Sequence, residues 1–241
     1  RNSGKGRFEA VTTSAKITAN NNVNKALFVD LDHDGDLDLF ETTAASNLVF
    51  RNNGDGSFQE QAAKMGLSGT SANAHNAAFG DFDDDGDIDL FVANENAGNH
   101  LYSNQRQGIF KDRSQASGLT SKTGSRTVSV GDFNNDGFSD LFLTSLDGAK
   151  TELYRNTGNG SFEWVKNAKK MFEGLQQIKI YDTQFFDFDN DGFLDILIAG
   201  EPVNKEGRGL FLYHNNATGT RVAVPTLLPH APMTTSQASF T

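Results

Sequence analysis

The chain has 241 residues, 37% of them apolar and 22% charged, with 24 glycines and 4 prolines, which is enough for a sizeable ordered core. Its formal net charge of −10 argues against binding to nucleic acid or to an anionic membrane surface, because both need basic patches. It contains no cysteine, which excludes disulfides, thiolate metal sites and cysteine nucleophiles.

The predicted elements repeat around four acidic segments with the pattern D-x-[DN]-x-D-G-x-x-D, which we call loops 1 to 4. The loops begin at residues 30, 81, 132 and 187, so they are 51, 51 and 55 residues apart. On both sides of each loop lies a short alternating stretch rich in Phe and β-branched residues, which predicts a strand. These stretches are 26–29 and 37–40, 77–80 and 88–92, 128–131 and 141–143, and 184–186 and 194–198.

Two further strands are predicted in each repeat. The third ends in an aromatic residue, a variable residue and Asn, and the fourth follows a Gly-rich turn that suits a tight hairpin. The third strands end at 50–52, 102–104, 154–156 and 213–215. The fourth strands contain an equivalent Phe that we expect to pack between repeats, namely Phe8, Phe58, Phe110 and Phe162. Single helical turns are predicted within the connections at 63–67, 116–119 and 166–175.

Each repeat is thus a four-stranded antiparallel meander that is hydrophobic on both faces, and such units stack radially in a β-propeller. A solenoid or a sandwich is the alternative, but solenoid coils are shorter and sandwiches lack an internal repeat. We expect one all-β propeller segment with four loop-bearing blades and a partial blade at each end, forming an open arc that further chain or a partner subunit completes. The expected blades are about 23–65, 75–117, 126–168 and 180–228, and the partial blades are 1–22 and 235–241.

The four loops carry the ligand pattern of a calcium site. Oxygen-bearing side chains at positions 1, 3, 5 and 9 and the backbone carbonyl of position 7 can surround one hard cation, while Gly at position 6 permits the sharp turn. Without a cation, repulsion among the carboxylates would push one or more of them toward protonation. One such loop could be a solvated acidic turn, but four in register argue against that interpretation. We therefore expect about four Ca²⁺ ions.

The predicted ligands follow from these positions. They are Asp30, Asp32, Asp34, Asp36 and Asp38 in loop 1, Asp81, Asp83, Asp85, Asp87 and Asp89 in loop 2, Asp132, Asn134, Asp136, Phe138 and Asp140 in loop 3, and Asp187, Asp189, Asp191, Phe193 and Asp195 in loop 4. Because Asn134 replaces an aspartate, we expect the third site to be the weakest. Glu41 also completes an EF-hand pattern in loop 1, but the predicted flanking strands argue against that motif.

The motifs around the loops resemble a known repeat. The run from Phe79-Gly80 through Gly86, with Asp89-Leu-Phe91 and the third-strand ending 101–104, is similar to the FG-GAP/VCBS repeats of integrin α-subunit propellers and bacterial exported proteins. The run 153–162, L-Y-R-N-x-G-x-G-S-F, is more similar to the bacterial and cartilage-acidic-protein branch. The resemblance covers nearly the whole chain and implies calcium between the first and second strands of each blade. The Phe-Gly pair is incomplete in the first and fourth repeats.

The sequence favours binding over catalysis. A catalytic carboxylate pair normally occurs once, whereas these clusters recur in every repeat, and no P-loop or G-x-S-x-G motif is present. The five histidines share no metal-ligand spacing, so we assign them to the surface or to packing. We expect no enzyme activity. The resemblance implies adhesion or binding of a protein or glycan ligand, with specificity in loops such as 94–99 and 201–209. The alternatives are an accessory propeller of a secreted polysaccharide lyase or phospholipase, and an architectural segment of an extracellular assembly.

Calcium also indicates a compartment. Extracellular sites of this ligand type often bind at roughly 10⁻⁴–10⁻³ M, a concentration that resting cytosol does not reach. We therefore expect a secreted, cell-surface or periplasmic protein. No apolar run approaches the ~18–20 residues that span a bilayer, so we expect no direct membrane insertion, and a signal peptide would lie outside this sequence.

Overall fold

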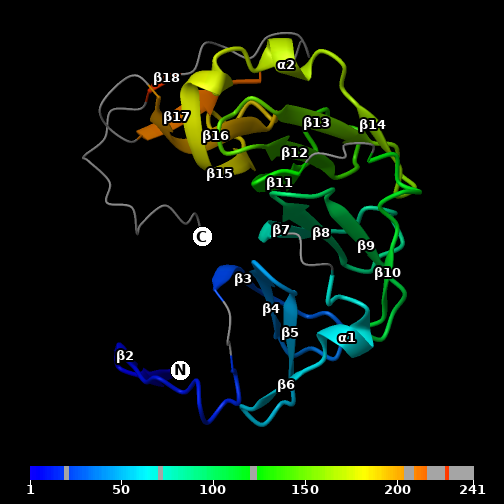
Figure 1. Cartoon of the computed structure of the whole chain (residues 1–241), viewed down its shortest axis with the longest axis vertical. Coiled ribbons are helices and arrows are strands. Elements are labelled where there is room, and N and C mark those ends of the chain that lie inside the picture. The colour runs from blue at the N-terminus through cyan, green and yellow to red at the C-terminus, as the bar shows by residue number, and fades with distance from the viewer. Residues whose placement is uncertain (19–21, 70–72, 120–123, 204–208, 216–225, 228–241) are drawn as a thin grey trace.

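The computed structural model describes residues 1–18, 22–69, 73–119, 124–203, 209–215 and 226–227. These residues form four antiparallel four-stranded sheets and one two-stranded sheet. The four large sheets, blades 1 to 4, follow one another around an arc (Figure 1). The predicted all-β propeller class is confirmed.

Each blade is a meander in which every strand pairs with the next one in the chain. Blade 1 contains β3 (Val23–Val29), β4 (Asp38–Thr43), β5 (Leu48–Asn52) and β6 (Phe58–Glu60). Blade 2 contains β7 (Ala74–Gly80), β8 (Asp89–Asn94), β9 (His100–Asn104) and β10 (Phe110–Asp112). Blade 3 contains β11 (Thr127–Gly131), β12 (Asp140–Thr144), β13 (Thr151–Asn156) and β14 (Phe162–Trp164). Blade 4 contains β15 (Ile178–Phe186), β16 (Asp195–Pro202), β17 (Gly209–Tyr213) and β18 (Thr226–Leu227).

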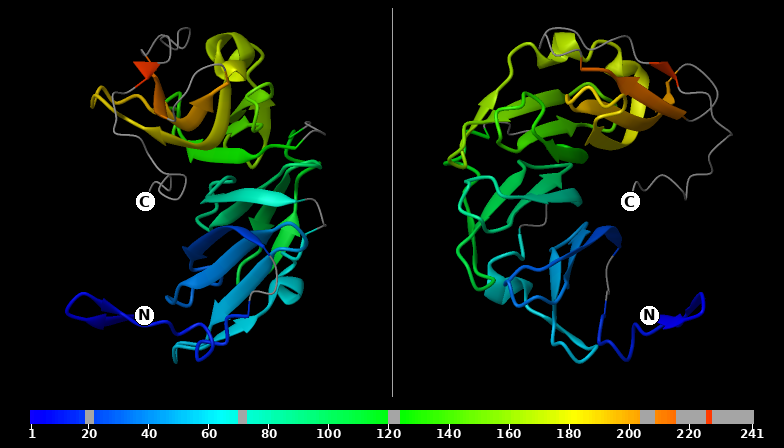
Figure 2. Two further views of the ribbon diagram at one scale, coloured as in Figure 1. Left: turned by 60° about the vertical axis from the view of Figure 1, so that its left-hand side comes forward. Right: turned by 180° about the vertical axis from the view of Figure 1, so that it is seen from behind.

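The first strands of the blades lie side by side on the inner side of the arc. Strand β7 contacts both β3 and β11, and β11 contacts β15. The fourth strands lie on the outer side, and Figure 2 shows the same stacking from two other directions. Loops 1 to 4 each connect a first strand to a second strand, so this arrangement gathers all four at one end of the blades.

Apolar side chains fill the three spaces between neighbouring blades. Every residue of β4, β8 and β12 is buried. The apolar residues of β8 face both neighbouring blades, since Leu90 belongs to the cluster shared with blade 1 and Phe91 to the cluster shared with blade 3. One buried cluster joins blades 1 and 2, a second joins blades 2 and 3, and a third joins blades 3 and 4. Phe110 and Phe162 belong to the first two clusters, as predicted for the Phe of the fourth strand. Phe8 is 78% exposed, so the same prediction is wrong for this residue.

Short helices occur in two of the three connections where we predicted helical turns. They are α1 (Ala62–Met65) and α2 (Ala168–Met171), the latter followed by the 3-10 helix η1 (Leu175–Gln177). The connection that includes 116–119 contains a single helical turn without a longer helix, because the Ser117 N–H bonds to the Arg113 carbonyl four residues earlier at 2.9 Å. Several first strands are also longer than predicted, and β15 reaches back to Ile178.

The two expected partial blades stay predictions. Residues 1–22 contain a hairpin of β1 (Asn2–Gly4) and β2 (Arg7–Phe8), which forms its own two-stranded sheet. Residues 235–241 lie outside the described part of the chain. On the flank of blade 1, Phe28 is 62% exposed and Leu37 is 55% exposed.

Candidate metal centres

The four loops share one backbone conformation. Position 4 is left-handed in every loop, with φ between 58° and 60°, and the glycine at position 6 has φ between 86° and 92°. Two left-handed residues this close turn the chain back toward its start, which explains why position 4 holds Asn, Asp or His, the residues that best tolerate positive φ, and position 6 holds glycine. The position 4 residues are His33, Asp84, Asn135 and Asn190.

Hydrogen bonds within each loop hold the first carboxylate in place. In loop 1, Asp30 accepts the N–H groups of Asp34 at 3.2 Å and Gly35 at 3.0 Å. The equivalent Asp81, Asp132 and Asp187 accept the same pair of N–H groups. The position 5 carboxylate accepts the N–H of position 7 in all four loops. The backbone therefore orients these two carboxylates before any cation binds.

The aspartate at position 9 closes the inner side of each loop. Asp38, Asp89, Asp140 and Asp195 are 0 to 2% exposed. In each, one carboxylate oxygen accepts the N–H of position 2 and the other accepts the N–H of the Asn that ends the third strand, at 2.7 to 3.2 Å. The position 5 aspartates are exposed by contrast. Each loop is thus a cup with a buried floor and an open rim.

Burial shifts the pKa of the position 9 aspartate in loops 1, 2 and 3. It raises the pKa of Asp89 and of Asp140 to about 7, with neighbouring carboxylates adding to the effect. It also raises the pKa of Asp38. We predicted raised pKa values from crowding of like charges, but desolvation by burial is the larger cause. A cation in the cup would stabilise the ionised form.

The predicted ligands converge in three loops. Carboxylate oxygens lie within 4.8 Å of one another in the sets Asp30, Asp32 and Asp38, Asp81, Asp83 and Asp85, and Asp187, Asp189 and Asp195. Two of these oxygens, Asp32 Oδ1 and Asp83 Oδ1, are buried and lack a hydrogen-bond partner. A buried acceptor without a donor is costly, and a cation would satisfy it. An all-oxygen donor set with such acceptors fits a hard cation such as Ca²⁺.

Loop 3 differs at position 3, as its sequence predicts. The Asn134 side-chain amide donates to Asp136 at 3.0 Å, and its oxygen accepts the Asp136 N–H at 3.1 Å. The floor and the position 1 carboxylate are unchanged. In all loops the position 7 carbonyls of Asp36, Asp87, Phe138 and Phe193 remain predicted ligands. The Asp87 side chain itself is buried and pairs with Arg106 at 2.8 Å.

Sequence reasoning missed the role of the third-strand Asn. Asn104, Asn156 and Asn215 each donate one amide hydrogen to position 8 of their own loop and the other to position 2 of the preceding loop. The residue therefore links the acidic loops of two neighbouring blades. Its recurrence in phase with the loops was a visible signal. The turn that follows this Asn also packs closely against the preceding loop. A Cβ added to Gly108 would lie only 3.0 Å from the Cβ of Asp32, so the close approach favours glycine.

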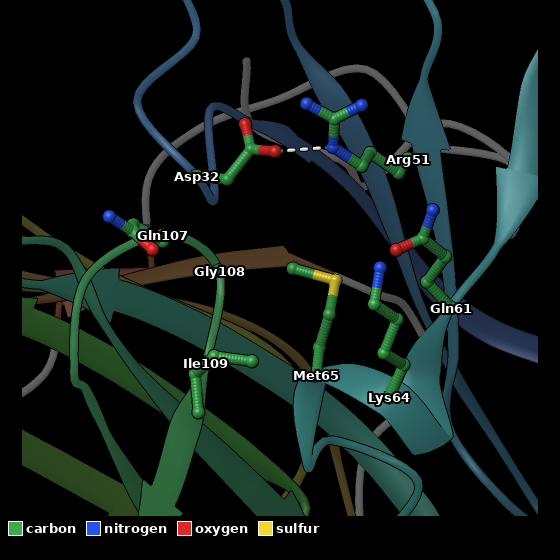
Figure 3. A pocket seen from close by; sticks show the side chains of 8 residues that line it. All are labelled: Asp32, Arg51, Gln61, Lys64, Met65, Gln107, Gly108 and Ile109. Carbon is green, nitrogen blue, oxygen red and sulfur yellow. Dashed lines mark hydrogen bonds and ion pairs between the residues drawn. The ribbon is translucent and has the colours of Figure 1, made fainter.

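The residue before this Asn also contacts the loops and was not predicted to do so. Arg51 donates to Asp32 through Nε and to Asp34 through Nη2 at 2.6 Å (Figure 3). Ser103 donates to Asp83 at 3.3 Å in loop 2. In blade 3, Arg155 turns away from the loop and bonds to Glu163 at 2.7 Å.

The fourth equivalent is a histidine. His214 Nε2 lies 3.3 Å from Asp189 and 3.7 Å from Asp191. We assigned every histidine to the surface or to packing, and the His214 side chain lies partly exposed at the edge of loop 4. His33 makes a second such contact, because its Nδ1 lies 3.3 Å from Asp87 of loop 2. Neither contact could be read from histidine spacing, because the partners come from other strands or another blade.

Comparison with known proteins agrees with this geometry. A family model described as an FG-GAP-like repeat matches residues 30–92, 81–143 and 132–198, and each match includes two successive loops. This chain belongs to the FG-GAP-like repeat family. The FG-GAP-like region thus covers all four loops and most of the four blades.

Individual relatives are more distant. Over 165 residues the chain is 28% identical to human cartilage acidic protein 1 and 27% identical to the mouse protein. These matches include 64% of this chain but 24% and 25% of the relatives, so the chain spans about a quarter of their length. A solved structure of an Agrocybe aegerita lectin is similar in fold, with a TM-score of 0.52 at 20% identity, and covers 84% of this chain and 51% of the lectin chain. Among the described residues, no helix has the length and apolar character needed to cross a bilayer.

Proposed function

We propose that this FG-GAP-like chain is a calcium-stabilised propeller segment of an extracellular protein that binds a protein or glycan ligand and has no catalytic activity. The observation that carries the proposal is the cup repeated in loops 1 to 4, with its oriented rim and its buried position 9 carboxylate. A site that recurs in each blade supports structure throughout the arc rather than one reaction. Extracellular calcium reaches the millimolar concentrations that such sites often need.

Metal analysis tests the first half of the proposal. The chain is dialysed against excess EDTA and then titrated with CaCl₂ by calorimetry, with MgCl₂ as the comparison. We expect up to four Ca²⁺ per chain and weaker binding of Mg²⁺, because the smaller ion prefers near-ideal octahedral geometry and keeps its water. Failure to bind calcium at millimolar concentration would show that the loops are acidic turns.

An open cavity of about 520 Å³ is the candidate ligand site. It is lined by polar residues that include His100, Asp112, Ser114 and Gln115, and by the end of the predicted specificity loop 94–99. The His100 imidazole is held at 2.8 Å from Asp112 and stacks on Tyr102. The volume of this cavity falls within the ~300–1,000 Å³ range of small-molecule sites. The other predicted specificity loop, 201–209, lies largely outside the described residues.

A glycan array tests the second half. The lectin of similar fold recognises non-reducing terminal N-acetylglucosamine, so glycans are the first ligand class to examine. We expect binding that requires calcium and that Gln115→Ala weakens, while Gln176→Ala, at an exposed glutamine outside the cavity, leaves it unchanged. Absence of binding to any glycan would exclude a lectin activity and direct the search to protein ligands.

A further inference from the structure

Loops 1 and 2 carry the same predicted ligands. Both carry aspartate at positions 1, 3, 5, 7 and 9, and both have the same backbone turn. In loop 2, Arg106 and His33 contact the Asp87 side chain, but the predicted ligand at that position is the backbone carbonyl. Ligand identity therefore predicts equal calcium affinity for the two loops. The side chain that the third strand places against the rim differs, because blade 1 has Arg51 where blade 2 has Ser103.

Arg51 contacts two of the carboxylates that a cation in loop 1 would use. Its Nε binds Asp32 Oδ2 and its Nη2 binds Asp34 Oδ2, at positions 3 and 5 of the loop. Such charge-assisted bonds are among the stronger side-chain interactions. The Arg51 side chain is 30% exposed and that of Asp32 is 11% exposed, so water screens the pair only in part. Ser103 offers loop 2 a neutral hydroxyl instead.

The neighbouring strand explains why Arg51 turns to the loop and Arg155 does not. In the sheet register, Arg51 lies opposite Gln59, whereas Arg155 lies opposite Glu163. Arg155 pairs with that glutamate at 2.7 Å. Arg51 has a neutral neighbour, and the nearest carboxylates it binds are those of loop 1.

Space beside the pair allows the arginine to leave. Asp32 and Arg51 line a cavity of about 250 Å³ between blades 1 and 2, together with Gln61, Lys64 and the hairpin at 107–109. Figure 3 shows the guanidinium at the edge of this cavity, with the Arg51 Nε directed at Asp32. A cation that enters the loop can therefore displace the guanidinium without rearranging a packed core.

We propose that Arg51 is a built-in competitor for the cation of loop 1, so that loop 1 binds calcium more weakly than loop 2. The inference rests on the proposed calcium function. In this proposal Arg51 is not a calcium ligand, and it lowers the calcium affinity of loop 1 by binding the ligands Asp32 and Asp34. The residue opposite each arginine on the fourth strand then decides whether the arginine binds the loop. Gln59 leaves Arg51 free to bind loop 1, whereas Glu163 holds Arg155 away from loop 3.

Calcium titration followed by NMR of the full chain resolves the loops individually. The amides of Gly35, Gly86, Gly137 and Gly192 each donate to the position 1 carboxylate of their own loop, so their signals report that loop. We expect Gly86 to reach its midpoint at a lower calcium concentration than Gly35. In Arg51→Ser, the Gly35 midpoint should fall by about tenfold, which corresponds to ~1.4 kcal/mol, while the Gly86 midpoint stays in place.

Two further variants separate competition from a general change in charge. Gln59→Glu should also lower the Gly35 midpoint by giving Arg51 another partner, and it should have little further effect in an Arg51→Ser background. Arg155→Ser is the matched control, because Arg155 bonds to Glu163 rather than to loop 3. This variant should leave the calcium midpoint of the Gly137 signal unchanged. Equal midpoints for Gly35 in wild type and Arg51→Ser would overturn the inference while calcium binding stands. No response from any of the four glycines at millimolar calcium would overturn the proposed function and this inference with it.

Discussion

At the scale of the residue, the third-strand Asn shows why one amide side chain is required. The Asn156 oxygen accepts the Gly158 N–H at 3.0 Å, and its two amide hydrogens reach the carbonyls of Phe82 at 2.9 Å and Ser139 at 3.1 Å. An amide has two donors and one acceptor group, which this site uses completely. Aspartate would supply no donor and serine only one.

Replacing this Asn should therefore weaken the contact between blades. We expect Asn156→Ala to lower the free energy of unfolding by about 2–3 kcal/mol, because buried carbonyls lose their donor. Asn52→Ala is the matched control, since Asn52 donates its amide to Leu37 within its own blade and is only half-buried. Urea unfolding in saturating calcium measures both. Equal losses for the two variants would contradict a role between blades.

The predicted ligands could be placed from sequence, and the side chains that contact them could not. Spacing alone places Asp30 and its equivalents, because the whole loop lies within nine consecutive residues. Arg51 and Arg155 occupy the same place in the repeat and point to different acids, so a repeat pattern cannot distinguish them. The direction depends on Gln59 and Glu163, and that contrast requires the register of the paired strands.

At the scale of the element, each loop combines a buried carboxylate at position 9 with more exposed carboxylates at positions 1 and 5. The buried carboxylate belongs to the second strand and accepts two backbone N–H groups, while the more exposed ones belong to the turn. The sequence pattern predicts this turn but not the burial of its last aspartate, which arises when the next strand closes over it.

The metal-free loops should therefore give an unusual pH dependence. The folded pKa of Asp89 and Asp140 is about 7, above the ~3.9 of an unfolded aspartate. Between these values the folded chain binds more protons than the unfolded chain, so its stability falls as pH rises. In EDTA we expect a higher urea midpoint near pH 5 than near pH 8. Saturating calcium should remove this trend, because it binds the ionised form.

One histidine acts in the opposite sense and needs its own control. Burial lowers the pKa of His75, so its contribution to stability is lost as pH falls below about 6.5. His75→Gln removes this opposing contribution, so the urea midpoint in EDTA should fall more steeply as pH rises. A urea midpoint that rises with pH in EDTA, in that variant, would contradict the raised pKa of the buried aspartates.

At the scale of the whole molecule, stability is distributed over three seams between four blades. Each seam has an apolar cluster, and an acidic loop lies beside it at one end. The repeat length and the two-faced strands predicted this architecture. The bounds of the inner strands were less predictable, because their first residues, such as Val23 and Asn24, are exposed and lack the apolar alternation.

Removal of metal should accordingly affect the whole arc. A site held at ten times its dissociation constant contributes about 1.4 kcal/mol, and several sites add together. We expect EDTA to lower the thermal midpoint and to speed proteolysis, and excess calcium to restore both. An unchanged midpoint would mean that the loops contribute no metal-dependent stability.

The bonds that the third-strand Asn makes across each seam all point to the preceding loop in the chain. Asn104 and Gly108 of blade 2 contact loop 1, and Asn156 and Gly160 of blade 3 contact loop 2. A blade that is duplicated or exchanged during evolution therefore brings the groups that fit the loop before it, and relies on the blade after it to cover its own. We therefore expect the gain or loss of an entire repeat to preserve the contact between each loop and the blade that covers it, and a boundary that falls within a blade to break that contact.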